Sequence, residues 1–361
     1  MSAYICYLLL AGIQIPLFYR RDKLQRRCFD AKNYLTICCI ELVLLAGFRG
    51  YTVGSDTSTY LMAIDYYDKL SVSELIFAKL VYPFDFEIGY FLLTKLSVLL
   101  GLGKTGFLFI IALIVYIPIF NFVKKHSPMP YVSILCYFAF GFFSNSLGLF
   151  RQMIAISILL LGWKYIEGRN FVKYLLIVVL AMTFHTTAFV AIFLYFIYDI
   201  KWERVLIWLI PIEAILLLFG NRIIALVLRV FSQYAGYVGG KYDLQGGSYL
   251  MLILLNAVLI ASIVFRDKNN DNCENMTICA LFLAIFLQCL GYSMEIFGRT
   301  VSYFSIYIII AIPNLIYNIG NQFGDRLRVI LSTITIICLF ALIYISFNGN
   351  HHVVPYYTIF G

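Results

Sequence analysis

The chain opens with an apolar stretch followed by a basic one: residues 4–18 read YICYLLLAGIQIPLF and residues 20–27 read RRDKLQRR. As a helix, an uncharged stretch of this length can enter a bilayer whose hydrocarbon core is about 30 Å thick. Loops rich in Lys and Arg stay on the cytoplasmic side, so the basic stretch predicts a cytoplasmic loop and an external N-terminus. Because the basic cluster follows the apolar run, we expect a retained membrane helix rather than a cleaved signal peptide.

The composition extends this prediction to the whole chain. Of the 361 residues, 62% are hydrophobic and only 13% are charged, and the mean hydropathy is +0.88. A soluble protein needs charged residues to cover its surface, whereas lipid solvates apolar side chains directly. The sequence therefore predicts a single integral membrane domain over residues 1–361, an all-α polytopic membrane protein with about 11–13 transmembrane or re-entrant helices.

The net charge of +8 is also explained by a membrane protein, in which basic residues gather in cytoplasmic loops. Basic loops recur along the chain, around Lys124, Lys164, Lys201, Arg266 and Arg326. If all of them are cytoplasmic, an even number of crossings separates each neighbouring pair. Orientation in the membrane thus accounts for most of the basic residues, and we expect no nucleic-acid partner.

Two intervals do not obey the even-crossing rule. Three apolar runs lie between residues 32 and 124, so we expect residues 88–102 to form a re-entrant or interfacial helix. One long run covers residues 172–198, and the charge rule favours a bend near residues 182–187 that brings His185 to the external side. A single tilted helix is the alternative. A broken helix at membrane depth is tolerated only where it lines protein or a water cavity.

On this topology, two segments lie outside the membrane. Residues 49–87 form an external, periplasmic segment that carries several carboxylates, and residues 220–248 form a second external loop segment. The nine cysteines are scattered, mostly within apolar runs, and their spacing matches neither a metal site nor a disulfide framework. We therefore expect no metal ligands among them.

Three arginines, Arg49, Arg151 and Arg299, each lie at the external end of an apolar run. The guanidinium group is a planar fork of donors that suits phosphate and keeps its charge at any accessible pH. If the three converge at one membrane surface, they could hold a diphosphate lipid headgroup. The alternative is that each side chain simply extends to the membrane interface.

Three other ionisable residues are candidates for catalysis. His185 lies in the apolar run AMTFHTT, residues 181–187, where an ionisable group is costly and is by default a functional candidate; the alternative is a hydrogen-bonded packing histidine. Asp56 and Glu87 each precede a predicted helix, where capping the helix N-terminus is the structural alternative.

Several short motifs follow one another along the chain: FRGYTVGSDT (48–57), FEIGY (86–90), SNSLGLFRQMIA (144–155), FHTT (184–187), GRTVSYF (298–304) with Ile312-Pro313 behind it, and VPYY (354–357). Taken together and in this order, these motifs resemble the pattern of the EpsG family, a Wzy-like group of bacterial polysaccharide polymerases, from about Arg49 to the C-terminus. The chain has Thr57-Ser58 where many members have a basic or aromatic residue after the aspartate.

The resemblance implies a membrane-embedded glycosyltransferase of the GT-C type that makes O-antigen or exopolysaccharide. A sugar hydroxyl of one lipid-linked repeat unit would attack the anomeric carbon of the growing chain, and undecaprenyl diphosphate would leave. We expect Arg49, Arg151 and Arg299, with Gln152 beside Arg151, to bind the diphosphate and the substrate. We expect His185 to be the base, with Asp56 or Glu87 as the second choice.

The same resemblance implies the surroundings of the enzyme. It places the protein in the bacterial inner membrane as a multi-pass protein, with its active site on the periplasmic side and no metal or other cofactor. Its partners would be the undecaprenyl-diphosphate-linked glycan donor and acceptor, membrane lipid and, in some systems, a chain-length regulator protein.

A lipid-linked oligosaccharide flippase or transporter is the alternative function. It would share the apolar composition and the arginines, but it should show internal repeats and ionisable residues near the middle of paired segments. The sequence has no convincing repeat, and its charges cluster at one surface. A membrane acyltransferase would need an acid close to its histidine, and His185 has none adjacent in sequence.

Overall fold

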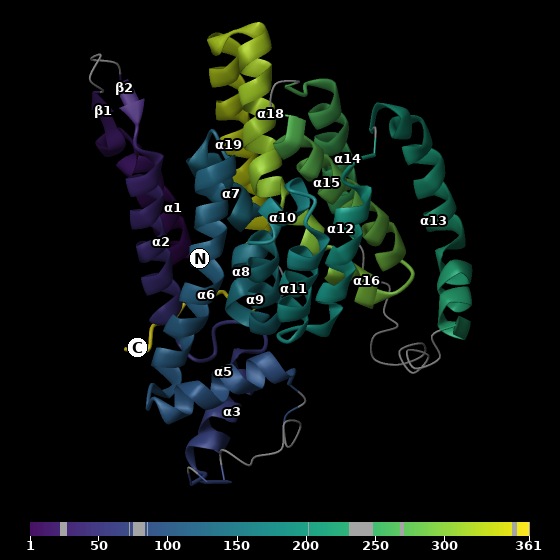
Figure 1. The fold of residues 1–361 in the computed structure, drawn as a ribbon. Helices are drawn as coiled ribbons and strands as arrows, with labels where there is room; N and C mark the ends of the chain where they lie inside the picture. Colours follow the sequence, from purple (N-terminus) through teal and green to yellow (C-terminus); the bar gives the residue numbers. More distant parts are fainter. Residues whose placement is uncertain are drawn as a thin grey trace. The chain divides into compact units, whose positions relative to one another are not determined.

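The computed structural model describes residues 1–21, 27–71, 73–74, 84, 86–200, 202–230, 248–267, 271–348 and 352–360 (Figure 1). These residues form two compact units. The first unit comprises Met1–Tyr165, Val172–Phe189 and Ile330–Gly361, and the second comprises Ile166–Phe171 and Val190–Val329. The single domain expected over residues 1–361 stays a prediction, and the expected external segment 220–248 lies largely outside the described residues.

The first unit contains the N-terminal helices and one small hairpin. Its elements are α1 (Ser2–Gln14), η1 (Ile15–Phe18), β1 (Tyr19–Arg21), β2 (Arg27–Phe29), α2 (Ala31–Gly47), α3 (Thr57–Asp68), α5 (Ile88–Leu99), α6 (Gly103–His126), α7 (Pro130–Ala139), α8 (Phe142–Gly148), α9 (Phe150–Leu160) and α11 (Phe171–Met182), whose first residue belongs to the second unit. The two strands pair antiparallel, with Arg20 opposite Cys28.

The second unit is helical in its described parts. It contains α12 (Ile192–Ile197), α13 (Trp202–Val230), α14 (Tyr249–Val264), α15 (Asp271–Gly291), α16 (Glu295–Thr300), α17 (Ser302–Ser305) and α18 (Ile308–Phe323). Three further elements cross the division between the units: α10 (Trp163–Glu167), η2 (Thr186–Ala191) and α19 (Asp325–Phe347).

The helices confirm an all-α polytopic membrane protein. Among the described residues, four helices are long and apolar enough to span a bilayer, in α6, α13, α15 and α19, and two bent pairs raise this to six if each pair is one span. Six shorter apolar helices accompany them, which are candidates for the re-entrant part of the expected set. The GT-C-like architecture stays a prediction.

The two intervals that break the even-crossing rule contain a short helix and a helix break in the structure. Helix α5 has only 12 residues, about 18 Å of helix, which is too short to cross the hydrocarbon core; it lies across α6 rather than along it (Figure 1). The run 172–198 is broken, because α11 ends at Met182 and the next helical turn begins at Thr186. The helix is thus interrupted within the predicted residues 182–187, and a single continuous tilted helix is wrong; that His185 reaches the external side stays a prediction.

Helix α6 is the central element against which α2 and α9 pack. The contact with α2 is close because Gly47 has no side chain: a Cβ there would come within 2.5 Å of the Phe109 ring. The contact with α9 includes a hydrogen bond from the Ser157 hydroxyl to the Val115 carbonyl, at 3.0 Å. These contacts hold the ends of α2 and α9, where Arg49 and Arg151 lie, in one packed unit.

The C-terminal tail returns to the loop that follows α2. The Gly50 amide donates to the Tyr357 carbonyl at 2.7 Å, and the Ile359 amide donates to the Phe48 carbonyl at 3.0 Å. Further along, the Gly54 amide donates to the His352 carbonyl at 3.0 Å. The first and last motifs of the sequence, FRGYTVGSDT and VPYY, are therefore neighbours in space.

Gly54 is the tightest position in this loop. Its φ is +111°, a left-handed conformation that glycine adopts readily and alanine does not. A Cβ at Gly54 would also lie 2.0 Å from the Leu147 carbonyl oxygen, so the loop 49–56 and the end of α8 can approach this closely only because residue 54 is glycine.

Gly54→Ala should lower the free energy of unfolding by about 2–4 kcal/mol, since it combines backbone strain with a clash. Gly101→Ala is the matched control, because Gly101 also has a positive φ, +64°, but a Cβ added there would meet nothing within 4 Å; it should cost only about 1 kcal/mol. Thermal unfolding of the purified variants in detergent measures the difference. Equal losses would mean that the contact with Leu147 does not constrain the loop.

Candidate active site

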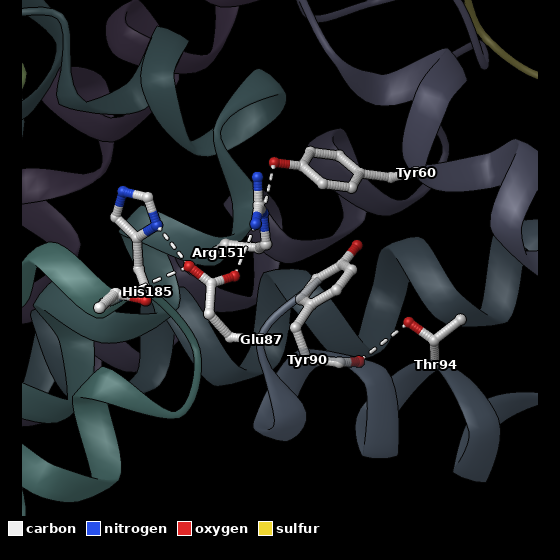
Figure 2. Close-up of polar contacts among 7 residues, drawn as sticks. Tyr60, Glu87, Tyr90, Thr94, Arg151 and His185 are labelled. Atoms are coloured by element: carbon white, nitrogen blue, oxygen red, sulfur yellow. Dashed lines mark hydrogen bonds and ion pairs between the residues drawn. The ribbon is translucent and has the colours of Figure 1, made fainter. Parts of the chain in front are cut away.

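One carboxylate, Glu87, connects two of the ionisable residues singled out in the sequence (Figure 2). Its Oε2 atom accepts a hydrogen bond from Nη1 of Arg151 at 2.6 Å, and its Oε1 atom lies 3.1 Å from Nδ1 of His185. Oε1 also accepts from the backbone amide of Thr186 at 3.2 Å. The side chains of Glu87, Arg151 and His185 are 17%, 26% and 26% exposed, so the cluster is largely buried but keeps partial exposure.

The position of Glu87 follows from how α5 begins. Glu87 is the residue that precedes α5, and its side chain makes no capping hydrogen bond to the helix, so the structural alternative of capping does not describe it. The Gly89 amide instead donates to the Thr183 carbonyl at 2.7 Å, and a Cβ at Gly89 would lie 2.8 Å from that oxygen. The start of α5 therefore lies directly on the break after α11, which brings Glu87 to His185.

Arg151 lies in the first turn of α9, where it contacts a second partner. Its Nε atom donates to the Tyr60 hydroxyl at 3.4 Å, and its guanidinium carbon lies 5.4 Å from the centre of the Phe86 ring. Tyr60 itself stacks on Phe150, with ring centres 4.7 Å apart. Tyr60 of α3, with Phe86 and Glu87 just before α5, thus surround the guanidinium group that α9 supplies.

The electrostatics of Glu87 follow from these contacts. Burial alone would raise the pKa of its carboxyl group, but the hydrogen bond with His185 and the positive charge of Arg151 outweigh it and lower the pKa from 4.5 to about 2. Glu87 is therefore ionised at any physiological pH, and it can only accept hydrogen bonds from its neighbours.

This lowered pKa predicts a pH-dependent contribution to stability. Because the folded-state pKa is below 4.5, ionised Glu87 stabilises the fold fully above about pH 4.5, and the stabilisation is lost as the pH falls towards 2. Wild type should therefore exceed Glu87→Gln in unfolding free energy by roughly 1–3 kcal/mol at neutral pH, and the difference should narrow at pH 4.5 and below. Denaturant unfolding of both proteins between pH 7 and acidic pH measures this difference in unfolding free energy. A difference that stays constant with pH would contradict the lowered pKa of Glu87.

Arg49 lies close by but has a different environment. Its side chain is 1% exposed, and its guanidinium donates to three backbone carbonyls, those of Ala46, Val53 and Leu147. Burial lowers its pKa to about 10, which leaves it charged at neutral pH. In this geometry Arg49 connects the end of α2, the following loop and the end of α8; its predicted contact with a diphosphate stays a prediction.

The remaining predicted site residues are spread over both units. Asp56 precedes α3, is exposed, and makes no side-chain capping hydrogen bond. Gln152 lies next to Arg151 in α9 and is 7% exposed. Arg299 lies in the second unit, in the last turn of α16, and is exposed. Their roles in catalysis or binding stay predictions.

The sequence did not single out Tyr60, and it offered Glu87 only as the second choice of base after His185. A signal existed for Tyr60, because it follows Asp56 by one helical turn and therefore lies on the same face of α3. No spacing along the chain indicated that Glu87, Arg151 and His185 meet, because they belong to three separate segments. Within the described parts of the chain, no group of three or more His, Cys, Asp and Glu side chains gathers as a metal site would require.

The fold and this cluster define a polytopic membrane protein in which a carboxylate, an imidazole and a guanidinium group meet at the ends of apolar helices. The chain matches the model of the EpsG family over residues 32–358 and belongs to that family. Members of the family are Wzy-like polymerases, so the chain is a polymerase-like glycosyltransferase of polysaccharide biosynthesis. No curated protein and no solved structure matches it.

Proposed function

We propose that the protein polymerises oligosaccharide repeat units linked to undecaprenyl diphosphate, at the periplasmic face of the bacterial inner membrane, for O-antigen or exopolysaccharide synthesis. The observation that carries this proposal is the Glu87 carboxylate held between His185 and Arg151. It joins a candidate base to a candidate anion-binding group within one cluster, and glycosyl transfer from a diphosphate needs both.

The contact with Glu87 determines which nitrogen of His185 can act as the base. Because ionised Glu87 can only accept, Nδ1 of His185 carries the proton in their 3.1 Å contact. In the neutral ring, Nε2 then has a free lone pair, and in Figure 2 it lies on the side of the ring away from Glu87. Glu87 thus orients the imidazole so that Nε2 can take a proton.

The reaction would proceed by one displacement at the anomeric carbon. Nε2 of His185 takes the proton of the acceptor sugar hydroxyl as the hydroxyl oxygen attacks. The bond from the anomeric carbon to the phosphate oxygen breaks, and the leaving undecaprenyl diphosphate takes the electron pair. A new glycosidic bond forms, and His185 returns its proton to solvent.

Arg151 would stabilise the negative charge that develops on the leaving diphosphate. Part of its side chain stays exposed while Nη1 binds Glu87 and Nε binds Tyr60, and a planar guanidinium group is a fork of N–H donors that suits phosphate oxygens. The leaving group already carries charge, so a fixed guanidinium group can supply the stabilisation that a metal ion supplies in other transferases. We therefore propose a metal-independent reaction.

Chain elongation by the purified protein is the direct test. Protein reconstituted with lipid-linked repeat units should produce longer glycans without nucleotide sugar, and addition of EDTA should leave the rate unchanged. Gel separation of the released glycans measures this. Movement of lipid-linked units across the vesicle membrane with no elongation would instead identify a flippase and refute the polymerase.

Variants of the cluster test the assigned roles. His185→Ala should lower the elongation rate by about 100-fold or more through loss of the base, and Arg151→Ala by a similar factor through loss of charge stabilisation. Arg20→Ala is the matched control: Arg20 pairs with Asp30 on the surface, at 3.4 Å, and its loss should leave the rate unchanged. Wild-type activity in either cluster variant, at equal expression, removes that residue from the mechanism.

A further inference from the structure

A ligand-sized space lies at the end of α9 opposite Arg151. Its volume is about 390 Å³, which is within the range of small-molecule sites. The cavity lies between the C-terminal part of α6, the region from Leu160 to Tyr165 and one residue of α11, Ile177. All these residues belong to the first unit. The mechanism proposed above does not use this cavity.

The lining combines an apolar interior with basic side chains. Pro118, Phe122, Leu160, Leu161 and Ile177 supply apolar surface, and Lys125 and Lys164 supply positive charge. The described lining residues include no Asp or Glu. An occupant that satisfies both parts of this lining has an apolar portion and a negative charge.

Aromatic side chains also line the cavity. The Trp163 ring is 2% exposed and lies 5.2 Å from Phe122 and 4.4 Å from His126, measured between ring centres. Tyr165 lies under the ammonium group of Lys164, at 4.9 Å. Trp and Tyr are enriched at the depth of lipid headgroups, so these rings are suited to a site that holds a lipid headgroup.

The two lysines come from separate loops that share one predicted side of the membrane. Lys125 lies in the last turn of α6, Lys164 lies in α10, and loop charge predicts both to be cytoplasmic. The cytoplasmic leaflet carries anionic lipids, and a basic side chain near its surface attracts them. Charge and position thus agree on the same class of ligand.

We propose that this cavity binds one anionic glycerophospholipid of the cytoplasmic leaflet. Its phosphate lies between Lys125 and Lys164, and one acyl chain lies along the apolar side chains of α6, α9 and α11. A water-soluble phosphate would use the lysines but not the apolar surface, and a zwitterionic lipid would use the apolar surface without the net charge. The proposal does not depend on the polymerase reaction.

Native mass spectrometry of the full-length protein tests this site. Protein in a neutral detergent is titrated with phosphatidylglycerol or phosphatidylcholine, and the fraction carrying one lipid is measured. We expect wild type to prefer phosphatidylglycerol, and Lys125→Gln/Lys164→Gln to weaken its binding roughly 10- to 30-fold, given the contribution of each lysine near anionic lipid. Lys32→Gln/Lys124→Gln is the matched control, because it removes the same charge from the same predicted face outside the cavity; it should retain binding.

Two further arms keep the proposal falsifiable. Leu161→Trp fills the apolar part without changing the charge, and it should also weaken phosphatidylglycerol binding; this arm decides the outcome if the double lysine variant does not fold. Glycerol phosphate at the concentration of the lipid should not displace it. If both double lysine variants lost phosphatidylglycerol binding equally, the lysines would act only through bulk charge attraction. If glycerol phosphate displaced the lipid, the cavity would be a site for a soluble anion. Either result, or unchanged binding by Leu161→Trp, overturns the proposal.

Discussion

A charged group removed from water needs partners, and this constraint organises the first unit around Arg49. The guanidinium of Arg49 donates to carbonyls at the end of α2, in the following loop and at the end of α8, and its charge lies 5.2 Å from the centre of the Phe150 ring. Carbonyls at helix ends have no partner within the helix. One side chain therefore satisfies several carbonyls at once, and it does so beside Phe150, the first residue of α9 and the neighbour of Arg151.

The same constraint explains the composition of the candidate active site. Glu87 is mostly buried and ionised, so it must be paired, and its two oxygens are taken by Arg151 and by His185 with the Thr186 amide. Ionised Glu87 stabilises the fold near neutral pH, but this pairing has a second consequence for the site. The pairing holds an imidazole and a guanidinium group in fixed orientations, as a catalytic site needs.

The first unit thus has two places where charge meets apolar surface, at opposite ends of α9. At one end the charges are paired with each other, and at the other Lys125 and Lys164 line an open cavity without acidic neighbours among its described lining residues. Paired charges suit a reaction that moves a proton and a leaving group. Lysines beside apolar surface suit binding of an amphiphile, so the two ends are suited to different ligands.

Hydropathy and loop charge by themselves determined the membrane class, the short helix at residues 88–99 and the break after Met182. These properties depend on the free energy of single segments in lipid, and that free energy follows from the length, hydropathy and charge of each segment. The motifs also identified His185, Arg151 and Glu87 one by one. Their meeting was decided only by the tertiary structure, because it requires α5 to begin on the Thr183 carbonyl, a contact that the missing side chain of Gly89 permits. The burial of Arg49 was likewise decided by the approach of Leu147, a residue 98 positions away along the chain.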